Sequence, residues 1–164
     1  MKIHQGKIRA FLVRLCKNYD LADDIAQDTF LNAFRKLSNY KGDGSFQGWL
    51  FRIAYNNFLQ HKRSANRRSK VTEEYAKQYL LIADNYESIS AEQIDLEKAM
   101  ATLNRNEVAA ITLCHSYGFS HQEVASILKT PLGTIKTNIN RGKSKLRKML
   151  YNSTTIESKM EKVS

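Results

Sequence analysis

The chain of 164 residues carries 26 Lys and Arg against 16 Asp and Glu, a formal charge of +10, and 42% of its residues are apolar. This composition excludes wholesale disorder, and no apolar run is long enough for a membrane-spanning helix. The N-terminus lacks a signal-peptide pattern, and Cys16 and Cys114 are far apart, so we expect a protein of the reducing cytoplasm without disulfides. Only 7 Gly and 1 Pro are present, which favours an all-α fold.

Charge divides the chain into three parts. Residues 1–70 carry 14 basic and 5 acidic side chains, residues 71–96 carry 1 and 6, and residues 97–164 carry 11 and 5. Two basic blocks of +9 and +6 therefore flank an acidic block of −5. We expect small helical domains at 1–70 and 97–152, an acidic linker at 71–96 and a tail at 153–164. Basic domains on both sides of an acidic linker favour a nucleic-acid partner.

Three amphipathic helices are predicted in the first block. The first carries apolar residues from Ile8 to Cys16, and Asp20 is the expected N-cap of the second. The second helix has an apolar face from Ala22 to Leu37. Its opposite face combines carboxylates with a bare leucine, which favours docking of a basic partner helix. This face comprises Asp24, Gln27, Asp28, Leu31 and Arg35.

The third helix begins near Phe46 and ends in a basic run. Aromatic and basic side chains alternate along it, which suits single-stranded or melted nucleic acid, because cations neutralise phosphates and rings stack on unpaired bases. Trp49 is expected to be at least partly core. The preceding loop contains glycine but lacks the phosphate-cradling pattern, so we expect no nucleotide site in it.

The linker is predicted to be a semi-ordered tether with a short helix from Thr72 to Leu81. Helix starts in the second block are predicted from capping pairs, namely Ser90 with Gln93, Asn104 with Glu107, Ser120 with Glu123, and Thr130 as N-cap before Pro131. A short helix, a break and a final helix with a polar, basic outer face predict a helix-turn-helix that reads a major groove.

Taken together, these residues resemble the extracytoplasmic-function sigma factors of bacterial RNA polymerase. One block, from Asp23 to Leu31 and from Phe46 to Asn56, is similar to the family's region two. A second block, with Gly118 to Ala125, Gly133 to Thr137 and Arg141 to Lys143, is similar to the region-four helix-turn-helix. The resemblance implies two helical domains that bind core RNA polymerase and promoter DNA. It implies an anti-sigma factor, often membrane-bound, and no catalytic residue, metal, cofactor or small-molecule substrate.

The resemblance also implies roles for individual residues. The polar face of the second helix would dock on the clamp coiled coil of the polymerase, and the linker would thread toward its active centre. The melted minus-ten strand would contact Lys41, Asp43, Ser45, Phe46, Arg52, Tyr55, Asn56, Lys62, Arg63 and Arg67. The minus-thirty-five duplex would contact Ser120, His121, Thr134, Lys136, Thr137, Asn138, Asn140, Arg141, Lys143 and Lys145.

Four positions depart from the family pattern. Lys129 replaces a glycine and would need either another backbone geometry or a mildly strained left-handed one. Gly142 replaces an alanine, at a cost of about 1 kcal/mol at most in helix propensity. Asn104 replaces a proline and can cap its helix, whereas Tyr55 replaces an arginine and would change the contacts to the strand.

Three other functions are open to such a chain. A free-standing helix-turn-helix regulator would leave two features without a role: the acidic docking face and the third helix with Trp49, Arg52 and Asn56. An enzyme is disfavoured because His4, His61, His115 and His121 show no metal-ligand or triad spacing. A membrane-surface protein is disfavoured because the polar faces of the basic helices carry Asn and Thr, which suit bases better than lipid.

Overall fold

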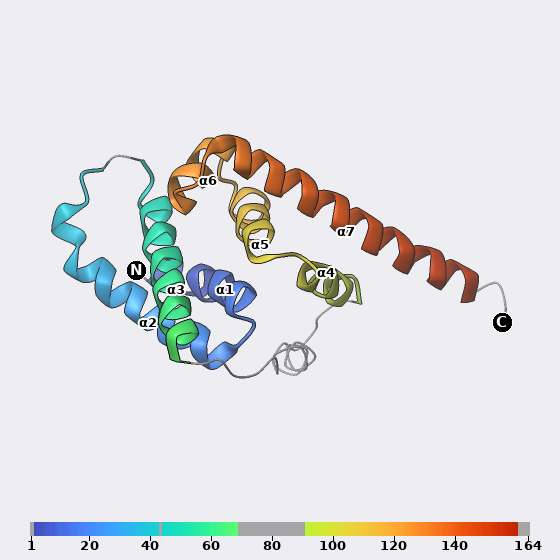
Figure 1. Ribbon diagram of the computed structural model, residues 1–164, viewed down its shortest axis with the longest axis horizontal. Coiled ribbons are helices and arrows are strands. Elements are labelled where there is room, and N and C mark those ends of the chain that lie inside the picture. The colour runs from blue at the N-terminus through green and yellow to red at the C-terminus, as the bar shows by residue number, and fades with distance from the viewer. Residues whose placement is uncertain (1, 43, 69–90, 161–164) are drawn as a thin grey trace.

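The computed structural model describes the backbone of residues 2–42, 44–68 and 91–160, and the side chains of residues 3–42, 44–65 and 95–151. Every regular element in these ranges is helical, as predicted (Figure 1). They are α1 (Lys2–Cys16), α2 (Tyr19–Arg35), the 3₁₀ turn η1 (Leu37–Asn39), α3 (Phe46–Arg68), α4 (Ala91–Ala101), α5 (Arg105–Ile111), the π-helical turn η3 (Thr112–Ser116), α6 (His121–Leu128) and α7 (Leu132–Met160). None of these helices is long and apolar enough to cross a membrane. The predicted helix from Thr72 to Leu81 and the capping role of Ser90 lie outside the described residues.

Helices α1, α2 and α3 form the N-terminal domain. Ile8, Phe11 and Leu12 of α1 are fully buried, and the predicted inner face of α2 is buried from Ala22 to Ala33. Buried polar side chains between α2 and α3 hydrogen-bond to each other: the Asn57 amide donates to Thr29 Oγ1 over 3.2 Å.

Two expectations for α2 are wrong. The N-cap is Asn18, whose side chain accepts from the backbone of Leu21 at 2.8 Å, because Asn18 rather than Asp20 has the extended backbone that a cap requires. Asp20 instead lies in the first turn, where its charge still favours the positive helix end. Leu37 does not belong to the buried face, because α2 ends at Arg35 and η1 leaves Leu37 46% exposed.

Helices α4 to α7 form the C-terminal domain. Both predicted capping boxes in the described part of this domain are present, at Asn104 with Glu107 and at Ser120 with Glu123. Thr130 does not cap α7, because its hydroxyl donates to the carbonyl of Leu128 at 3.2 Å, and α7 begins at Leu132. Helix α4 begins at Ala91, where the sequence predicts a helix start.

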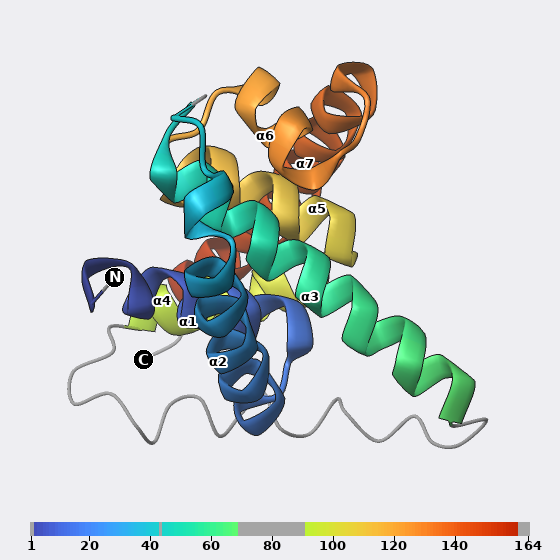
Figure 2. The ribbon, with the colours of Figure 1, turned by 90° about the vertical axis from the view of Figure 1, so that its left-hand side faces the viewer.

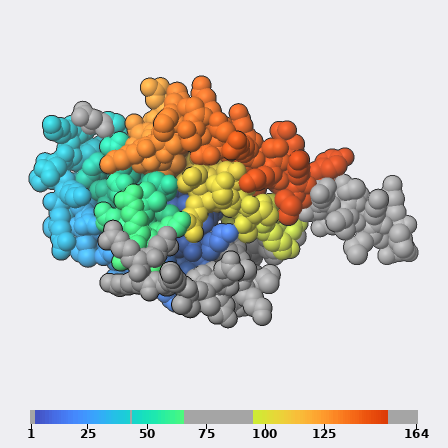
Figure 3. All heavy atoms as spheres, viewed as in Figure 1, coloured from blue at the N-terminus to red at the C-terminus, as the bar shows by residue number. Residues whose placement is uncertain are grey.

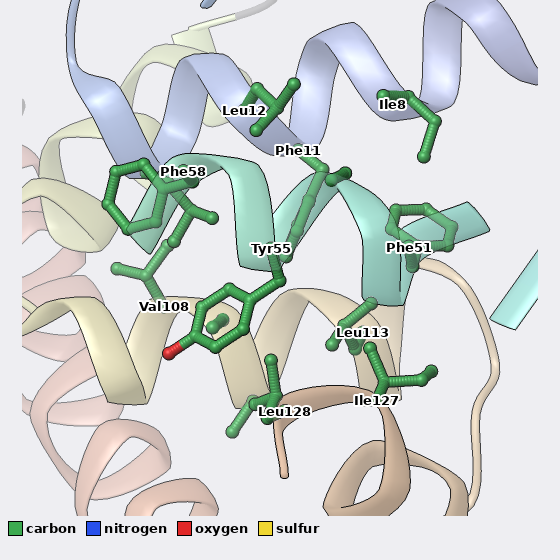
Figure 4. Packing of buried hydrophobic residues seen from close by; sticks show 14 of the residues in the cluster. Ile8, Phe11, Leu12, Phe51, Tyr55, Phe58, Val108, Leu113, Ile127 and Leu128 are labelled. Atoms are coloured by element: carbon green, nitrogen blue, oxygen red, sulfur yellow. The ribbon is translucent and has the colours of Figure 1, made fainter. Parts of the chain in front are cut away.

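The two domains pack against each other around one continuous apolar core. Phe51 of α3 contacts the rings of Tyr117 and Phe119 from the C-terminal domain, with centroids 4.6 and 5.6 Å away. Figure 4 shows Tyr55 of α3 directed toward Val108 and Leu128. Helix α6 lies on the first half of α3 in both ribbon views (Figures 1 and 2). We call this packing of α6 on α3 the closed arrangement.

Polar contacts connect the same two domains. The Arg14 guanidinium pairs with Glu97 at 2.7 Å, and the Tyr117 hydroxyl donates to the carbonyl of Lys7 at 2.8 Å. The surface view shows the atoms of α6 beside those of α3 (Figure 3). The closed arrangement therefore decides which predicted binding residues are accessible.

Candidate protein-docking and nucleic-acid interfaces

The predicted docking face of α2 is exposed along its whole length. Asp24, Gln27, Asp28, Leu31 and Arg35 are all exposed, and Leu31 retains 56% of its accessible surface. Exposed apolar surface continues to Phe34, which the sequence analysis did not include. A leucine and a phenylalanine exposed beside carboxylates are typical of a protein-docking surface.

A groove of about 610 Å³ runs beside this face, between α1 and α2. Gln27 and Leu31 of the docking face line it together with Phe30 and, from α1, Gly6. Asp28 also contacts the third helix, because its Oδ2 lies 3.0 Å from Nε2 of His61. The Asp28–His61 pair connects this face to α3.

The loop before α3 is held by an aromatic cluster and by two glycines. Gly42 and Gly44 adopt φ values of +79° and +86°, which glycine reaches without strain. The Tyr40 hydroxyl donates to the carbonyl of Gly44 at 2.9 Å, and its ring lies 5.6 Å from that of Phe46 and 5.2 Å from that of Trp49. Trp49 is half-buried in this cluster, as expected for partial core.

Tyr40 is a residue that the sequence analysis missed. The available signal was an aromatic residue directly before a glycine-containing loop, which often closes that loop. Ser45 has a structural role as well, because its hydroxyl accepts from the backbone of Gly48 at 3.0 Å and caps α3. Lys41 and Ser45 are exposed on this loop, and Asp43 lies outside the described residues.

Helix α6 covers part of the predicted minus-ten surface on α3. Both Nε and Nη2 of Arg52 donate to the carbonyl of Ser126, at 3.2 and 2.9 Å. Tyr55 is only 7% exposed, and burial raises the pKa of its hydroxyl. Asn56 and Lys62 are half-buried, Arg63 is exposed, and the side chain of Arg67 lies outside the described residues.

The contact between α3 and α6 is close at Gly48. A Cβ atom at this position would lie 3.5 Å from Phe119 and 3.7 Å from Ile127. A cavity of about 230 Å³ lies beside it, lined by Trp49 and Arg52 from α3 and by residues of α6. In the closed arrangement, melted DNA therefore has no access to the side chain of Tyr55.

The predicted duplex-reading face of α7 remains accessible. Asn138 is half-buried, while Thr134, Lys136, Thr137, Asn140, Arg141 and Lys143 are exposed. Ser120 and half-buried His121 lie at the start of α6. Lys129 ends α6 with φ +50° and ψ +47°, so of the two alternatives considered for it the left-handed backbone is the one adopted.

Two residues of α7 make contacts that the sequence analysis did not anticipate. Lys145 Nζ lies 2.8 Å from Oε2 of Glu107, a carboxylate that is 1% exposed and also caps α5. Gly142 is buried against Ile111, where a Cβ atom would lie 2.3 Å from Cδ1. The glycine therefore reflects close helix packing as well as lost helix propensity.

These observations define a helical, two-domain protein with an exposed acidic and apolar face on the first domain and a helix-turn-helix on the second. The described residues contain no cluster of His, Cys, Asp or Glu able to hold a metal ion. Residues 1–68 match the model of sigma-70 region 2, and residues 93–146 match that of sigma-70 region 4.

Curated relatives agree with both matches. The chain is 32% identical to the ECF RNA polymerase sigma factor SigE of Mycolicibacterium smegmatis, over 94% of this chain and 62% of that protein. It is also 32% identical to the ECF RNA polymerase sigma factor EcfG of Rhodopseudomonas palustris, over 88% of this chain and 79% of that protein. The chain belongs to the extracytoplasmic-function sigma factors of bacterial RNA polymerase, which are not enzymes.

Solved structures share the fold. The sigma factor RpoE of Bartonella quintana, in complex with the anti-sigma factor NepR, superposes with a TM-score of 0.72 and 27% identity, over 91% of this chain and 92% of that one. CnrH in complex with the cytosolic domain of CnrY superposes with a TM-score of 0.61 at 24% identity, over 92% of this chain and 84% of that one.

Proposed function

We propose that this sigma factor docks on core RNA polymerase through the exposed face of α2. The observation that carries the proposal is the combination of Asp24, Asp28 and exposed Leu31 on one rigid helix face. Carboxylates around an apolar centre fit a basic partner helix, because charge steers the encounter and apolar contact holds the complex. Such a partner would place the protein's action in the cytoplasm.

Promoter recognition is proposed to use two further surfaces. Exposed hydroxyl, amide and guanidinium groups on α7 suit base edges and phosphates of the minus-thirty-five duplex. The loop from Lys41 to Phe46, with Arg52, Tyr55 and Asn56 of α3, would hold the melted minus-ten strand. Since α6 covers Arg52 and Tyr55 in the closed arrangement, the two domains would separate before the melted strand binds.

An anti-sigma factor is proposed as a regulatory partner. The two solved relatives with the same fold are bound to an anti-sigma factor and to a cytosolic domain. A partner that binds the closed form would keep α6 on α3 and so prevent melted DNA from reaching Tyr55.

The decisive experiment is co-elution of the full chain with purified bacterial core RNA polymerase on gel filtration. Asp28→Arg is expected to abolish co-elution, because it puts a cation where a carboxylate meets the partner. Asp95→Arg on α4 makes the same change in net charge away from the face and should co-elute normally. Circular dichroism of both variants checks that the fold is intact.

Duplex binding gives a second, independent test. Arg141→Ala is expected to weaken binding to upstream promoter duplex and to leave co-elution with the polymerase unchanged. Loss of both activities would indicate misfolding. A chain that binds duplex but never co-elutes would contradict the proposal and favour a free-standing regulator.

A further inference from the structure

A second cleft, of about 530 Å³, lies between the two domains and away from α6. Four cationic side chains line it: Arg14 and Lys17 from the end of α1, Lys62 from α3, and Arg105 from the start of α5. Tyr55 and Phe58 form part of its apolar wall. No carboxylate occurs among the described residues that line this cleft, which we call the basic cleft.

The positive charge of the basic cleft is only partly compensated within the described part of the chain. Arg14 pairs with Glu97, and Lys17 Nζ donates to the carbonyl of Ala101 at 3.0 Å. No carboxylate in the described ranges pairs with Lys62 or Arg105. Closure of the domains therefore brings cations of both domains around one space.

The effect of this crowding is visible at Lys17. Burial lowers the pKa of its ammonium group, and the Arg105 guanidinium across the cleft lowers it further. Like charges that approach in a partly desolvated space repel each other more strongly than in water. An anion bound between them would remove this repulsion and so favour the closed arrangement by mass action.

The backbone of Lys17 provides a matched pair of variants for testing its charge. Lys17 follows the last residue of α1 with φ +55°, a left-handed conformation that glycine adopts at lower cost. Glycine would therefore end this helix with less strain but without a cation. Lys129 at the end of α6 has the same conformation, with φ +50°, and does not line the basic cleft.

We propose that the basic cleft binds a small anion with two or more phosphate groups, such as a diphosphate or a nucleoside triphosphate. Three cations beyond the Arg14–Glu97 pair, namely Lys17, Lys62 and Arg105, favour a multiply charged ligand, and the planar guanidinium of Arg105 matches phosphate geometry. The cleft volume of about 530 Å³ falls within the range of small-ligand sites. The proposal goes beyond promoter recognition, and its test needs neither polymerase nor DNA.

The test is isothermal titration calorimetry on the full chain at constant ionic strength. The probes are inorganic pyrophosphate, ATP, GTP and, as a carboxylate of similar charge, citrate. Saturable 1:1 binding of the phosphates is expected, with citrate much weaker. Arg105→Gln and Lys17→Gly should each weaken phosphate binding about tenfold, because each removes one charged contact.

Lys129→Gly is the matched control, since it removes the same charge from the same backbone conformation outside the cleft. It should leave the affinity unchanged. Nucleotide binding tighter than that of pyrophosphate would support a nucleoside phosphate, and equal affinities would support recognition of the phosphates alone. No saturable heat from any phosphate, equal binding of citrate, or an equal loss in Lys129→Gly would overturn the proposal.

Discussion

The closed arrangement predicts that a larger side chain at Gly48 will separate the domains. Gly48 lies in the first turn of α3, where its missing side chain lets Phe119 and Ile127 approach. Leucine at this position would extend beyond Cβ into the space that these two residues occupy. Alanine adds only Cβ, which would lie at ordinary contact distances of 3.5 and 3.7 Å from these two residues. The Ser45 hydroxyl, at 3.1 Å from this Cβ, would have to shift slightly.

The size of the effect follows from the packing of two nearly buried side chains, Phe119 and Ile127, which are 7% and 4% exposed. Overpacking by leucine costs about 1–3 kcal/mol, so Gly48→Leu should shift the equilibrium toward separated domains by about 5- to 150-fold.

Trp49 provides the assay because it is the single tryptophan of the chain and lines the cavity between α3 and α6. Gly48→Leu should increase acrylamide quenching of its fluorescence and raise the radius of gyration in X-ray scattering. Gly48→Ala should match the wild type in both. If leucine and alanine variants are equally compact and equally quenched while both remain folded, α6 does not pack on Gly48 in solution and the reasoning fails.

Three further predictions concern stability and reactivity. Lys145→Met should lower the free energy of unfolding in urea by about 2 kcal/mol, because the buried Glu107 carboxylate loses its cation. The loss is smaller than for a fully buried pair because the Lys145 side chain is half-exposed. Lys148→Met is the control and should leave the stability unchanged. Hydrogen bonds from Ser120 lower the pKa of the Glu123 carboxyl below its ordinary 4.5. The stability advantage of the wild type over Glu123→Gln should therefore be complete above about pH 4.5 and disappear as the pH falls through the lowered pKa, in unfolding curves measured between about pH 6 and 3. Burial raises the pKa of the Cys16 thiol from 9.0 to about 12, so iodoacetamide at pH 8 should modify it about a thousandfold more slowly than an ordinary thiol, with urea restoring the rate in peptide mass spectrometry.

Features that depend on neighbouring residues were predictable from the sequence. The exposed and buried faces of α2 follow from helical periodicity, and both described capping boxes follow from a side chain three residues before its partner. These features need no knowledge of distant contacts, because they involve one helix or one turn.

Features that depend on packing between helices were not predictable. Asn18 competes with Asp20 for the same cap, and the path of the preceding turn decides between them. The sequence alone marks Gly142 as a loss of helix propensity, whereas in the structure the Ile111 side chain occupies the space that a Cβ atom at Gly142 would need. Tyr40 holds its loop through ring contacts with Phe46 and Trp49, and spacing alone does not reveal them.

The packing of the two domains against each other is the feature that is least predictable from the sequence. Periodicity finds an apolar face on α3 and another on α6, but each could be completed within its own domain. Nothing in either segment says that the carbonyl of Ser126 will accept from Arg52, or that Tyr55 will be buried by the other domain. The same aromatic and basic residues that suit a melted strand also suit an apolar interface with a polar rim. Residues whose chemistry suits nucleic acid can therefore be covered by another part of the same chain. Their accessibility has to be tested as well as their chemistry.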